Sequence, residues 1–309
     1  MPSLGHYPTP VEFLEPFSHA GSSLWIKRDD LTHPIYGGNK VRKLERILVR
    51  ARDNGATTLL TLGAIGSHHV LATTVHGRHA GFQVEAVLVP QPRTPHVVET
   101  LEASLAAGLV AHSVSSWARV PAAIARRLGP HTAFVTVGGS NVDGALGYHD
   151  AAFELAEQVR QGQVPEPDLV VVALGSAGTA GGLVAGLASC GLRSRVVGVA
   201  IADPPILLRA IALRLARGCV DLPRRALAER LLVETGFRGP GYGFPTARGE
   251  EALQRASFCG LLLDPTYTAK AFAAALDLVD RRAARTVLYW HTLSSAPMAP
   301  LLVGAPDLE

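Results

Sequence analysis

The stretch DLVVVALGSAGTAGGLVAG, residues 168–186, decides the fold class of this chain. It begins with a run of apolar, largely β-branched residues, passes through a glycine-rich turn and continues as a second apolar segment. A continuous apolar run that ends in glycine is typical of a strand buried on both faces of a parallel sheet. The stretch therefore predicts a strand–turn–helix unit of an α/β protein.

The same alternation extends along the chain in both directions. It predicts βαβ units, mostly parallel sheets and ligand binding at the C-terminal ends of strands. The polar, proline-bearing segment 160–168 and a second break near 37–43 indicate two lobes. Further strands are predicted at 57–63, 84–89, 132–137, 195–201 and 286–292, and helices at 43–55, 68–81, 96–108, 148–162, 179–191, 206–218 and 269–282.

The glycine-rich turn has the composition of a phosphate-binding cup. Its glycines let the backbone approach a ligand closely, and Ser176 and Thr179 add hydroxyl groups where the helix begins. No Gly-Lys-Ser/Thr follows, so this is not a Walker A sequence. A dinucleotide site or a purely structural turn would fit the same glycine spacing.

Composition narrows the class of protein. The 309 residues are 48% hydrophobic and 18% charged, which suits one or two globular domains with a large core. The net charge of +3 is small and the basic residues are scattered, which argues against a nucleic-acid partner. The three widely spaced cysteines form no CxxC pair, and no apolar run is long enough to span a bilayer. The first residues lack a signal-peptide pattern, so we expect a cytoplasmic protein with no membrane partner.

Lysine is scarce, so each one carries information. Of the 29 basic residues only four are lysines, namely Lys27, Lys40, Lys43 and Lys270. Arginine replaces lysine as a surface cation but cannot form a Schiff base. Lys40 stands in YGGNKVRKLE (36–45), at the predicted entrance to a helix, where the positive end of the dipole favours a neutral amine. A solvated turn lysine is the alternative reading.

A second turn of this kind is TLGAIGSHH (61–69), where a strand leads into a helix. Ser67 is well placed as the N-cap, and the exposed N–H groups behind it can bind an anion such as a carboxylate. A plain capping serine is the alternative. The nearby histidines lack an Asp, Glu or Cys at convincing spacing, so we predict no metal.

Two tyrosines fall in loop motifs near the C-terminus. Tyr242 lies in GPGYGFPT (239–246), and Tyr267 lies in LLLDPTYTAKA (261–271), where Asp-Pro starts a turn before a helix. By themselves, both residues fit a core or interface role as well as a site.

Taken together and in this order, the motifs resemble the fold-type II pyridoxal phosphate (PLP) enzymes, and among them the 1-aminocyclopropane-1-carboxylate (ACC) deaminase and D-cysteine desulfhydrase family. The segments PTPVEFLEP (8–16), LWIKRDDLTH (24–33), GGNKVRKLE (37–45) and VGGSNVDGALGY (137–148) extend the likeness over nearly the whole chain. The resemblance implies an α/β fold with two lobes like the tryptophan synthase β-subunit. It implies a large PLP-binding domain of residues 1–45 and 155–309, and a small domain of residues 46–154.

The resemblance also implies roles for single residues. Lys40 would hold PLP as a Schiff base and move the α-proton, with Ser67, Tyr242 and Tyr267 as the other catalytic residues. The substrate carboxylate would face Ser67, His68 and His69. The cofactor-binding residues would be Lys40, Asn39, His68, Gly175, Ser176, Ala177, Gly178, Thr179 and Thr268.

Thr268 would meet the pyridine nitrogen of the cofactor. ACC deaminases resemble one another in having glutamate at this position, whereas desulfhydrases have threonine. A neutral hydroxyl does not keep the ring protonated, so the ring is a weaker electron sink. That is sufficient for β-elimination, because the leaving group departs with the electrons.

Three positions depart from the family pattern. His68 stands where asparagine commonly bonds the 3-hydroxyl of the cofactor, Gly66 replaces a glutamine and should open space, and Leu293 replaces a glycine and should crowd the wall of the pocket. These changes bear on the substrate rather than on the cofactor.

The expected activity is that of a PLP-dependent lyase on a small amino acid, by β-elimination to a 2-oxo acid and ammonia, as in D-cysteine desulfhydrase. ACC deamination, β-replacement and cysteate sulfo-lyase activity are alternatives within PLP chemistry. A non-catalytic ligand-binding relative is an alternative of a different class. The family implies a homodimer.

Overall fold

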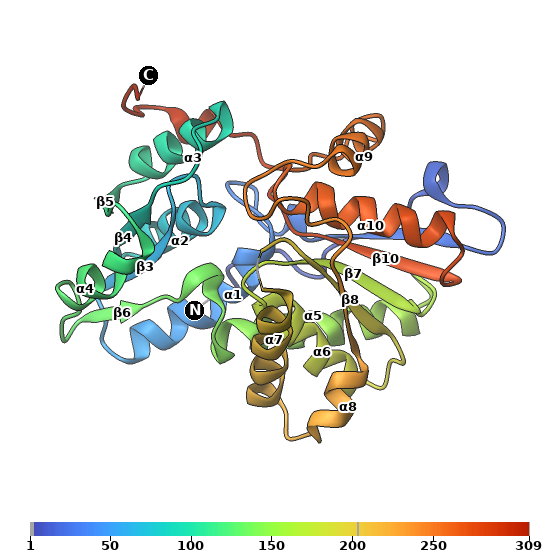
Figure 1. The fold of residues 1–309 in the computed structure, drawn as a ribbon. Helices are drawn as coiled ribbons and strands as arrows, with labels where there is room; N and C mark the ends of the chain where they lie inside the picture. The colour runs from blue at the N-terminus through green and yellow to red at the C-terminus, as the bar shows by residue number, and fades with distance from the viewer. Residues whose placement is uncertain (1–2, 203, 309) are drawn as a thin grey trace.

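Two sheets organise the computed structural model, which describes residues 3–202 and 204–308 (Figure 1). The larger sheet is parallel except for its first strand pair, and the smaller sheet is wholly parallel. This confirms the prediction of an α/β fold with mostly parallel sheets. The larger sheet has the order β1 (Val11–Phe13), β2 (Ser23–Arg28), β10 (Thr286–His291), β7 (Leu169–Leu174), β8 (Arg195–Ala200) and β9 (Leu231–Glu234); the smaller has the order β5 (Leu109–Ser113), β4 (Gln83–Val89), β3 (Thr58–Ala64) and β6 (Thr132–Phe134).

The larger sheet is covered by helices on both faces. Along β7, Val170 and Val172 face one hydrophobic core and Leu169 and Val171 face the other, because successive side chains of a strand point to opposite faces. The first core contains α5 (Val142–Arg160), α6 (Gly178–Ser189), α7 (Pro205–Cys219) and α8 (Arg224–Glu229), and the second contains α9 (Ala247–Ser257) and α10 (Thr268–Asp280).

The smaller sheet has the same layered plan. Leu59 of β3 points to the core formed with three helices, and the next residue, Leu60, points to the core on the opposite face. The core that contains Leu59 includes α1 (Asn39–Asp53), α2 (His68–His79) and α3 (Pro95–Ala106), and the core that contains Leu60 includes α4 (Val120–Ala125).

No helix in the described residues has the length and apolar character needed to cross a membrane.

The predicted strands and helices are present, with one strand shortened. The strand expected at 132–137 ends at Phe134, and residues 137–139 form a short 3-10 turn instead. Gly138 and Gly139 adopt φ values of 63° and 61°, in the left-handed region that ends a strand. The sequence did not predict the short edge strands β1, β5 and β9, the strand β2, or the helices α4, α8 and α9.

The two lobes are joined by several crossings of the chain. The C-terminal segment leaves β10 in the larger lobe, and Met298, Leu301 and Leu302 pack on the core of the smaller lobe near α3 (Figure 1). Leu44, Ile47, Leu48 and Ala51 of α1 belong to the core of the smaller lobe, and most of the buried apolar residues of α5 belong to a core of the larger lobe. The division at residues 45/46 and 154/155 stays a prediction.

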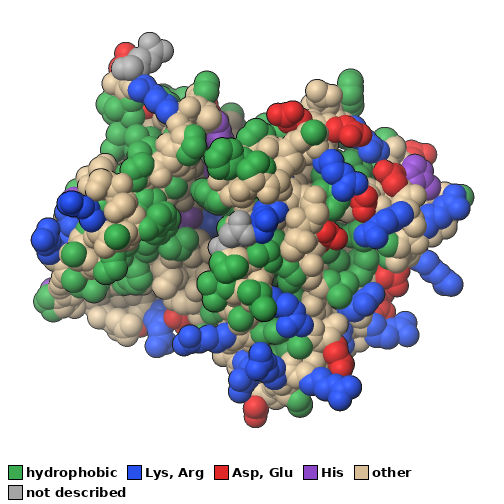
Figure 2. Space-filling model, in the orientation of Figure 1, with side chains coloured by type: hydrophobic (Ala, Val, Ile, Leu, Met, Phe, Trp, Pro, Cys, Tyr) green, Lys and Arg blue, Asp and Glu red, His purple; other side chains and the backbone are tan. Residues whose placement is uncertain are grey.

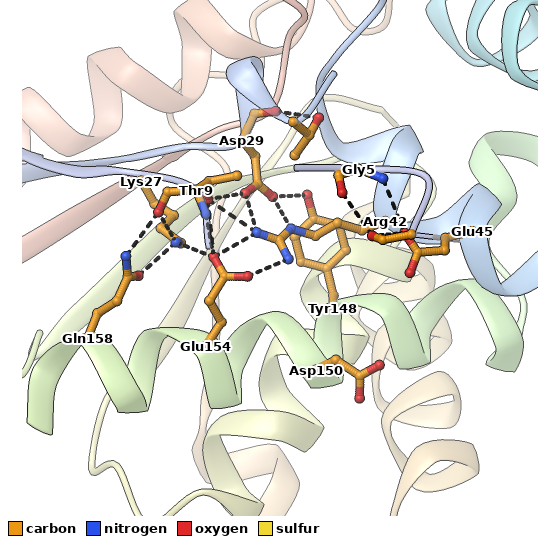
Figure 3. A network of polar contacts seen from close by, with 12 residues as sticks. Gly5, Thr9, Lys27, Asp29, Arg42, Glu45, Tyr148, Asp150, Glu154 and Gln158 are labelled. Atoms are coloured by element: carbon orange, nitrogen blue, oxygen red, sulfur yellow. Dashed lines mark hydrogen bonds and ion pairs between the residues drawn. The ribbon is translucent and has the colours of Figure 1, made fainter. Parts of the chain in front are cut away.

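A buried network of charges fixes α1 to the larger lobe (Figure 3). The Arg42 guanidinium donates to both carboxylate oxygens of Asp29, at 2.8 and 2.9 Å, and to Glu154 at 2.9 Å. Lys27 pairs with Glu154, and the Tyr148 hydroxyl donates to Asp29 at 2.7 Å. These residues come from β2, the turn after it, α1 and α5, so the network connects two helices with β2 and its turn.

The charges in this network compensate one another. Burial raises the pKa of Asp29, but the adjacent Arg42 outweighs it and holds the pKa below its usual range. Burial likewise raises the pKa of Glu154, which Arg42 and Lys27 more than offset. Both carboxylates are therefore ionised at neutral pH, and removal of one cation would leave buried negative charge uncompensated.

We expect Arg42→Met to lower the free energy of unfolding by about 3–5 kcal/mol, the usual cost of breaking a buried ion pair by removing one partner. Urea denaturation followed by circular dichroism measures this. Arg46→Met is the matched control, because Arg46 pairs with Asp150 on the surface, with side chains 52% and 48% exposed. Its effect should stay below about 1 kcal/mol. Equal effects of the two substitutions would contradict the role given to the network.

Candidate active site

A cavity of about 520 Å³ lies between the two lobes, at the ends of β3, β7 and β10. Figure 2 shows both lobes from the side of Figure 1, with basic and acidic side chains interspersed over the larger one. Of the thirteen residues predicted for the site, all but Gly178 line this cavity. The lining residues are Asn39, Lys40, Ser67, His68, His69, Gly175, Ser176, Ala177, Thr179, Tyr242, Tyr267 and Thr268.

Lys40 stands in the first turn of α1, as predicted. The helix begins after Gly38, which has a φ of 87°; a Cβ there would lie 2.6 Å from the carbonyl oxygen of Thr292, so this position requires glycine. The Lys40 ammonium donates to the Asn39 side-chain oxygen at 2.6 Å, and the Asn39 amide donates to the Thr179 hydroxyl at 3.1 Å. Asn39 thereby links the lysine to the glycine-rich turn.

The surroundings of Lys40 favour a neutral amine. Burial lowers the pKa of Lys40 to about 8, and the negative charge of Asp264 opposes this only in part. An amine with this pKa is unprotonated in an appreciable fraction of molecules near neutral pH. It can therefore act as a nucleophile or accept a proton.

The glycine-rich turn forms a cup for an anion. Ala177 adopts a φ of 70°, and α6 begins at Gly178. A Cβ at Gly178 would lie 3.0 Å from the Lys43 ammonium and 2.6 Å from the Ser140 hydroxyl oxygen. The Gly178 N–H donates to that oxygen at 3.1 Å, so Gly178 lies behind the cavity wall. The cup therefore combines a helix N-terminus, hydroxyl groups and a buried cation.

The sequence analysis did not predict Lys43 as a site residue, although the scarcity of lysine in this chain was a signal for it. It is 1% exposed, lines the cavity and donates to the Gly138 carbonyl at 3.0 Å. Burial, and then the nearby Lys40, hold the pKa of Lys43 well below its usual range. A buried ammonium with one neutral partner is costly, and a phosphate group beside it would restore its charge.

The loop after β3 supplies Ser67, His68 and His69. Ser67 caps α2 as predicted, accepting from the Val70 N–H at 3.4 Å. The buried His69 ring contacts the Thr61 hydroxyl at 2.9 Å. His68 contacts two residues that the sequence reading did not single out, Tyr36 and His96.

The structure shows the surroundings of Gly66 and Leu293, two of the positions that depart from the family pattern. Gly66 does not open space: a Cβ there would lie 2.7 Å from the Gln91 amide nitrogen and 2.9 Å from the Cα of Val97. The expectation was wrong because the start of α3 already fills that volume. Leu293 lies in the cavity wall, as expected.

The segment before α10 gathers the remaining predicted residues. The hydroxyl groups of Tyr242 and Tyr267 are 2.8 Å apart, and both rings line the cavity. The Thr268 hydroxyl donates to Asp264 at 2.6 Å. Asp264 was also missed. Its oxygens accept from the backbone N–H groups of Thr266, Tyr267 and Thr268, at 2.7–3.0 Å, so this carboxylate caps α10.

Comparison with known proteins identifies the family of the chain. Residues 2–292 match the family described as "Pyridoxal-phosphate dependent enzyme". The chain belongs to this family. As in other PLP-dependent enzymes, its cofactor is pyridoxal phosphate, and its two-lobed α/β architecture is that of fold type II.

The chain is also similar to individual proteins and solved structures. A protein of Thermotoga maritima that is named provisionally as an ACC deaminase is 33% identical over 295 residues, covering 92% of this chain and 93% of the relative. The crystal structure of an ACC deaminase homologue superposes with a TM-score of 0.82 at 27% identity, over 97% of this chain and 94% of that one. A hydrogen sulfide-producing enzyme of Fusobacterium nucleatum shares the fold, with a TM-score of 0.68 at 14% identity and 96% coverage of both chains.

The buried cup fits the phosphate of this PLP-dependent enzyme's cofactor. Ser176 and Thr179 present hydroxyl groups at the cavity, and the Lys43 ammonium, which also lines it, has no anionic partner among the described residues. Within residues 3–202 and 204–308, His, Cys, Asp and Glu form no group of three that could hold a metal ion.

We expect the cofactor-free Lys40→Met variant to be more stable than the wild type at pH 7. Burial of a protonated Lys40 costs on the order of 3 kcal/mol, at roughly 1.4 kcal/mol per pKa unit. The folded pKa of about 8 lies below the model-peptide value of 10.5, so the unfolded chain binds more protons between these values. Wild-type stability therefore rises with pH in that window, and the advantage of the variant shrinks.

Thermal unfolding between pH 7 and pH 10.5 measures this difference. Arg50→Met is the control on the same helix, because the Arg50 side chain is 68% exposed. A difference in stability between Lys40→Met and the wild type that stays constant from pH 7 to pH 10.5 would show that the charge of Lys40 does not cause it.

Proposed function

We propose that this PLP-dependent enzyme is a lyase that eliminates a β-substituent from a small amino acid, as D-cysteine desulfhydrases do. With a leaving group X, the balanced reaction is X–CH₂–CH(NH₃⁺)–COO⁻ + H₂O → CH₃–CO–COO⁻ + NH₄⁺ + HX. Thr268 carries the proposal, because a neutral hydroxyl and not a carboxylate stands at the position expected to meet the pyridine nitrogen. Elimination needs less electron withdrawal by the ring than ring opening does.

The hydrogen bonds around Thr268 support this choice. Asp264 is the acidic residue beside it, but four donors already occupy its two oxygens. Its charge therefore stabilises the start of α10. Thr268 is 1% exposed, and its hydroxyl group is fixed in position because it donates to the Asp264 carboxylate and accepts from the Asp264 N–H.

The other roles follow from the chemistry of the cavity. When bound, PLP supplies the electron-withdrawing group that makes the α-proton of the substrate acidic. Lys40 binds the cofactor and, with its lowered pKa, accepts the α-proton. The phosphate would be held by the turn of Gly175, Ser176, Ala177, Gly178 and Thr179, in which Gly178 contributes the start of α6 from behind the cavity wall, with Lys43 as a further ligand.

The remaining cavity residues orient the substrate. Ser67 and the start of α2 offer hydroxyl and N–H donors to the carboxylate, beside His68 and His69. Tyr242 and Tyr267 flank the substrate, and their paired hydroxyls can donate to a departing group. Asn39 accepts a hydrogen bond from the Lys40 ammonium, and His68 would lie beside the cofactor ring.

ACC ring opening is the second candidate, favoured by the names of the 33% and 27% identical relatives. β-Replacement and loss of sulfite from cysteate would use the same residues. A non-catalytic binding protein would have no need for a lysine whose pKa is lowered to about 8. We also propose a cytoplasmic homodimer with a PLP-binding domain of residues 1–45 and 155–309 and a small domain of residues 46–154, as the family resemblance implies.

The cofactor linkage is tested on the purified protein. We expect a yellow protein whose visible band is erased by borohydride, with the cofactor then fixed to the peptide that contains Lys40 in mass spectra. Lys40→Ala should bind PLP without a borohydride-fixed link and should lose turnover by at least about 10³-fold, since it lacks both the nucleophile and the base. A covalent band in Lys40→Ala would refute this assignment.

Substrate choice is tested with D-cysteine, L-cysteine, cysteate, D-serine and ACC, with 2-oxo acid and ammonia assayed together. We expect kcat/KM to be highest for a β-substituted amino acid and at least about tenfold lower for ACC, a difference of roughly 1.4 kcal/mol in transition-state binding. Turnover of ACC alone would replace the elimination proposal with the second candidate.

A further inference from the structure

His68 links the cavity to a chain of rings that runs toward the surface. The Tyr36 hydroxyl lies 2.6 Å from Nδ1 of His68, and Nε2 of His68 lies 2.9 Å from Nε2 of His96. Both ring nitrogens of His68 are thus in hydrogen bonds, one on each side. The family pattern has asparagine at position 68, and an amide at that position could bond to its neighbours but could not pass a proton through itself.

The two ends of this chain lie in different environments. Tyr36 is 3% exposed and, like His68, lines the cavity. His96 stands at the start of α3 with a side chain that is 43% exposed, and its Nδ1 lies 3.9 Å from the Glu99 carboxylate. One end therefore meets the substrate space and the other meets solvent.

The hydrogen bonds permit two consistent proton arrangements. In the first, Tyr36 donates to Nδ1 of His68, Nε2 of His68 donates to Nε2 of His96, and His96 carries its proton on Nδ1 toward Glu99. In the second, Nε2 of His96 donates to His68, and Nδ1 of His68 donates to the Tyr36 oxygen, whose proton faces the cavity. Each neutral ring keeps one proton in both arrangements.

We propose that Tyr36, His68 and His96 form a proton relay between the cavity and solvent, with Glu99 beside its outer end. Export takes a proton from the cavity onto the Tyr36 oxygen and releases one from Nδ1 of His96, which turns the first arrangement into the second. Import reverses every transfer, so each N–H or O–H bond that breaks is replaced by one that forms.

This inference rests on the proposed elimination, which needs such transfers. The substrate arrives as an ammonium and must lose a proton to react as an amine, and the leaving group and the product methyl group must each gain one. Lys40 can accept the α-proton, but a buried amine needs a path by which protons reach it and leave it.

Burial keeps the inner members of the relay neutral, as the scheme requires. The pKa of His68 is lowered to about 4, mainly by burial; Asp264 opposes this shift, and His96 and Lys40 contribute to it. Burial raises the pKa of Tyr36 well above its usual range, with Asp264 and Glu99 adding to it. At pH 7 neither group holds a net charge, so protons move along the chain without leaving a buried ion.

The functional test is chemical rescue of the holoenzyme with β-substituted amino acids as substrates. We expect His96→Ala to keep its cofactor spectrum and KM while kcat falls about 10- to 100-fold, at the lower end of the effect of a positioned proton-transfer group. Added imidazole should restore kcat at least several-fold, and rescue should vary with the pKa of substituted imidazoles. His96→Gln should lose as much kcat.

His112→Ala is the matched control, because His112 is a half-buried histidine of the same lobe that pairs with Glu85 outside the cavity. Its kcat should stay within about twofold of the wild type and should not respond to imidazole. An unchanged kcat in His96→Ala, or a loss that no imidazole restores, would overturn the relay.

A second measurement does not depend on turnover. In holoenzyme labelled with ¹⁵N-histidine, we expect a scalar coupling between Nε2 of His68 and Nε2 of His96, which should disappear in His96→Gln. Absence of the coupling in the wild type would also overturn the relay. A wild type that shows the coupling but turns over no β-substituted amino acid would instead refute the proposed function.

Discussion

The pairing of Arg42 with Asp29 and Glu154 is the interaction on which the site depends. Arg42 lies two residues after Lys40 and one before Lys43, on the helix that belongs to the core of the smaller lobe. Its partners belong to the larger lobe, on the turn after β2 and on α5. The position of the reactive amine relative to the glycine-rich turn is thus fixed by a buried charge pair, which tolerates little displacement before its desolvation is uncompensated.

The cavity is lined by ionisable groups whose charged forms are disfavoured by burial. Lys40, Lys43 and His68 all have lowered pKa values, and burial is the first cause in each case. Such an arrangement is unfavourable for the empty protein and favourable once an anionic cofactor and substrate are bound, so binding and stability are coupled. All four lysines of the chain are inside the protein or at the cavity, which leaves the surface cations to arginine.

Substitution of asparagine by histidine at position 68 changes the character of the site. An amide would serve as a fixed partner for the cofactor, whereas the imidazole joins Tyr36 on one side and His96 on the other. Leu293 adds its side chain to the wall of the cavity, and the space beside Gly66 is filled by Gln91 and Val97. We propose that the changes at positions 68 and 293 bear on substrate choice and proton supply rather than on cofactor binding.

The sequence by itself determined the fold class and most of the helices and central strands. These follow from local signals, because a buried strand, a glycine-rich turn and an N-cap are each formed by consecutive residues. The cofactor was indicated by the order of the motifs, which resembles a known family, and the role of Lys40 stays a prediction of that resemblance. It did not reveal the edge strands β1, β5 and β9, which are short and draw their stability from a neighbouring strand. Only the tertiary structure placed Lys43 at the cup, Asp264 under Thr268, α3 against Gly66, and His96 beside His68. Each of these contacts joins residues whose distance depends on how the chain packs, and no local pattern encodes such a distance.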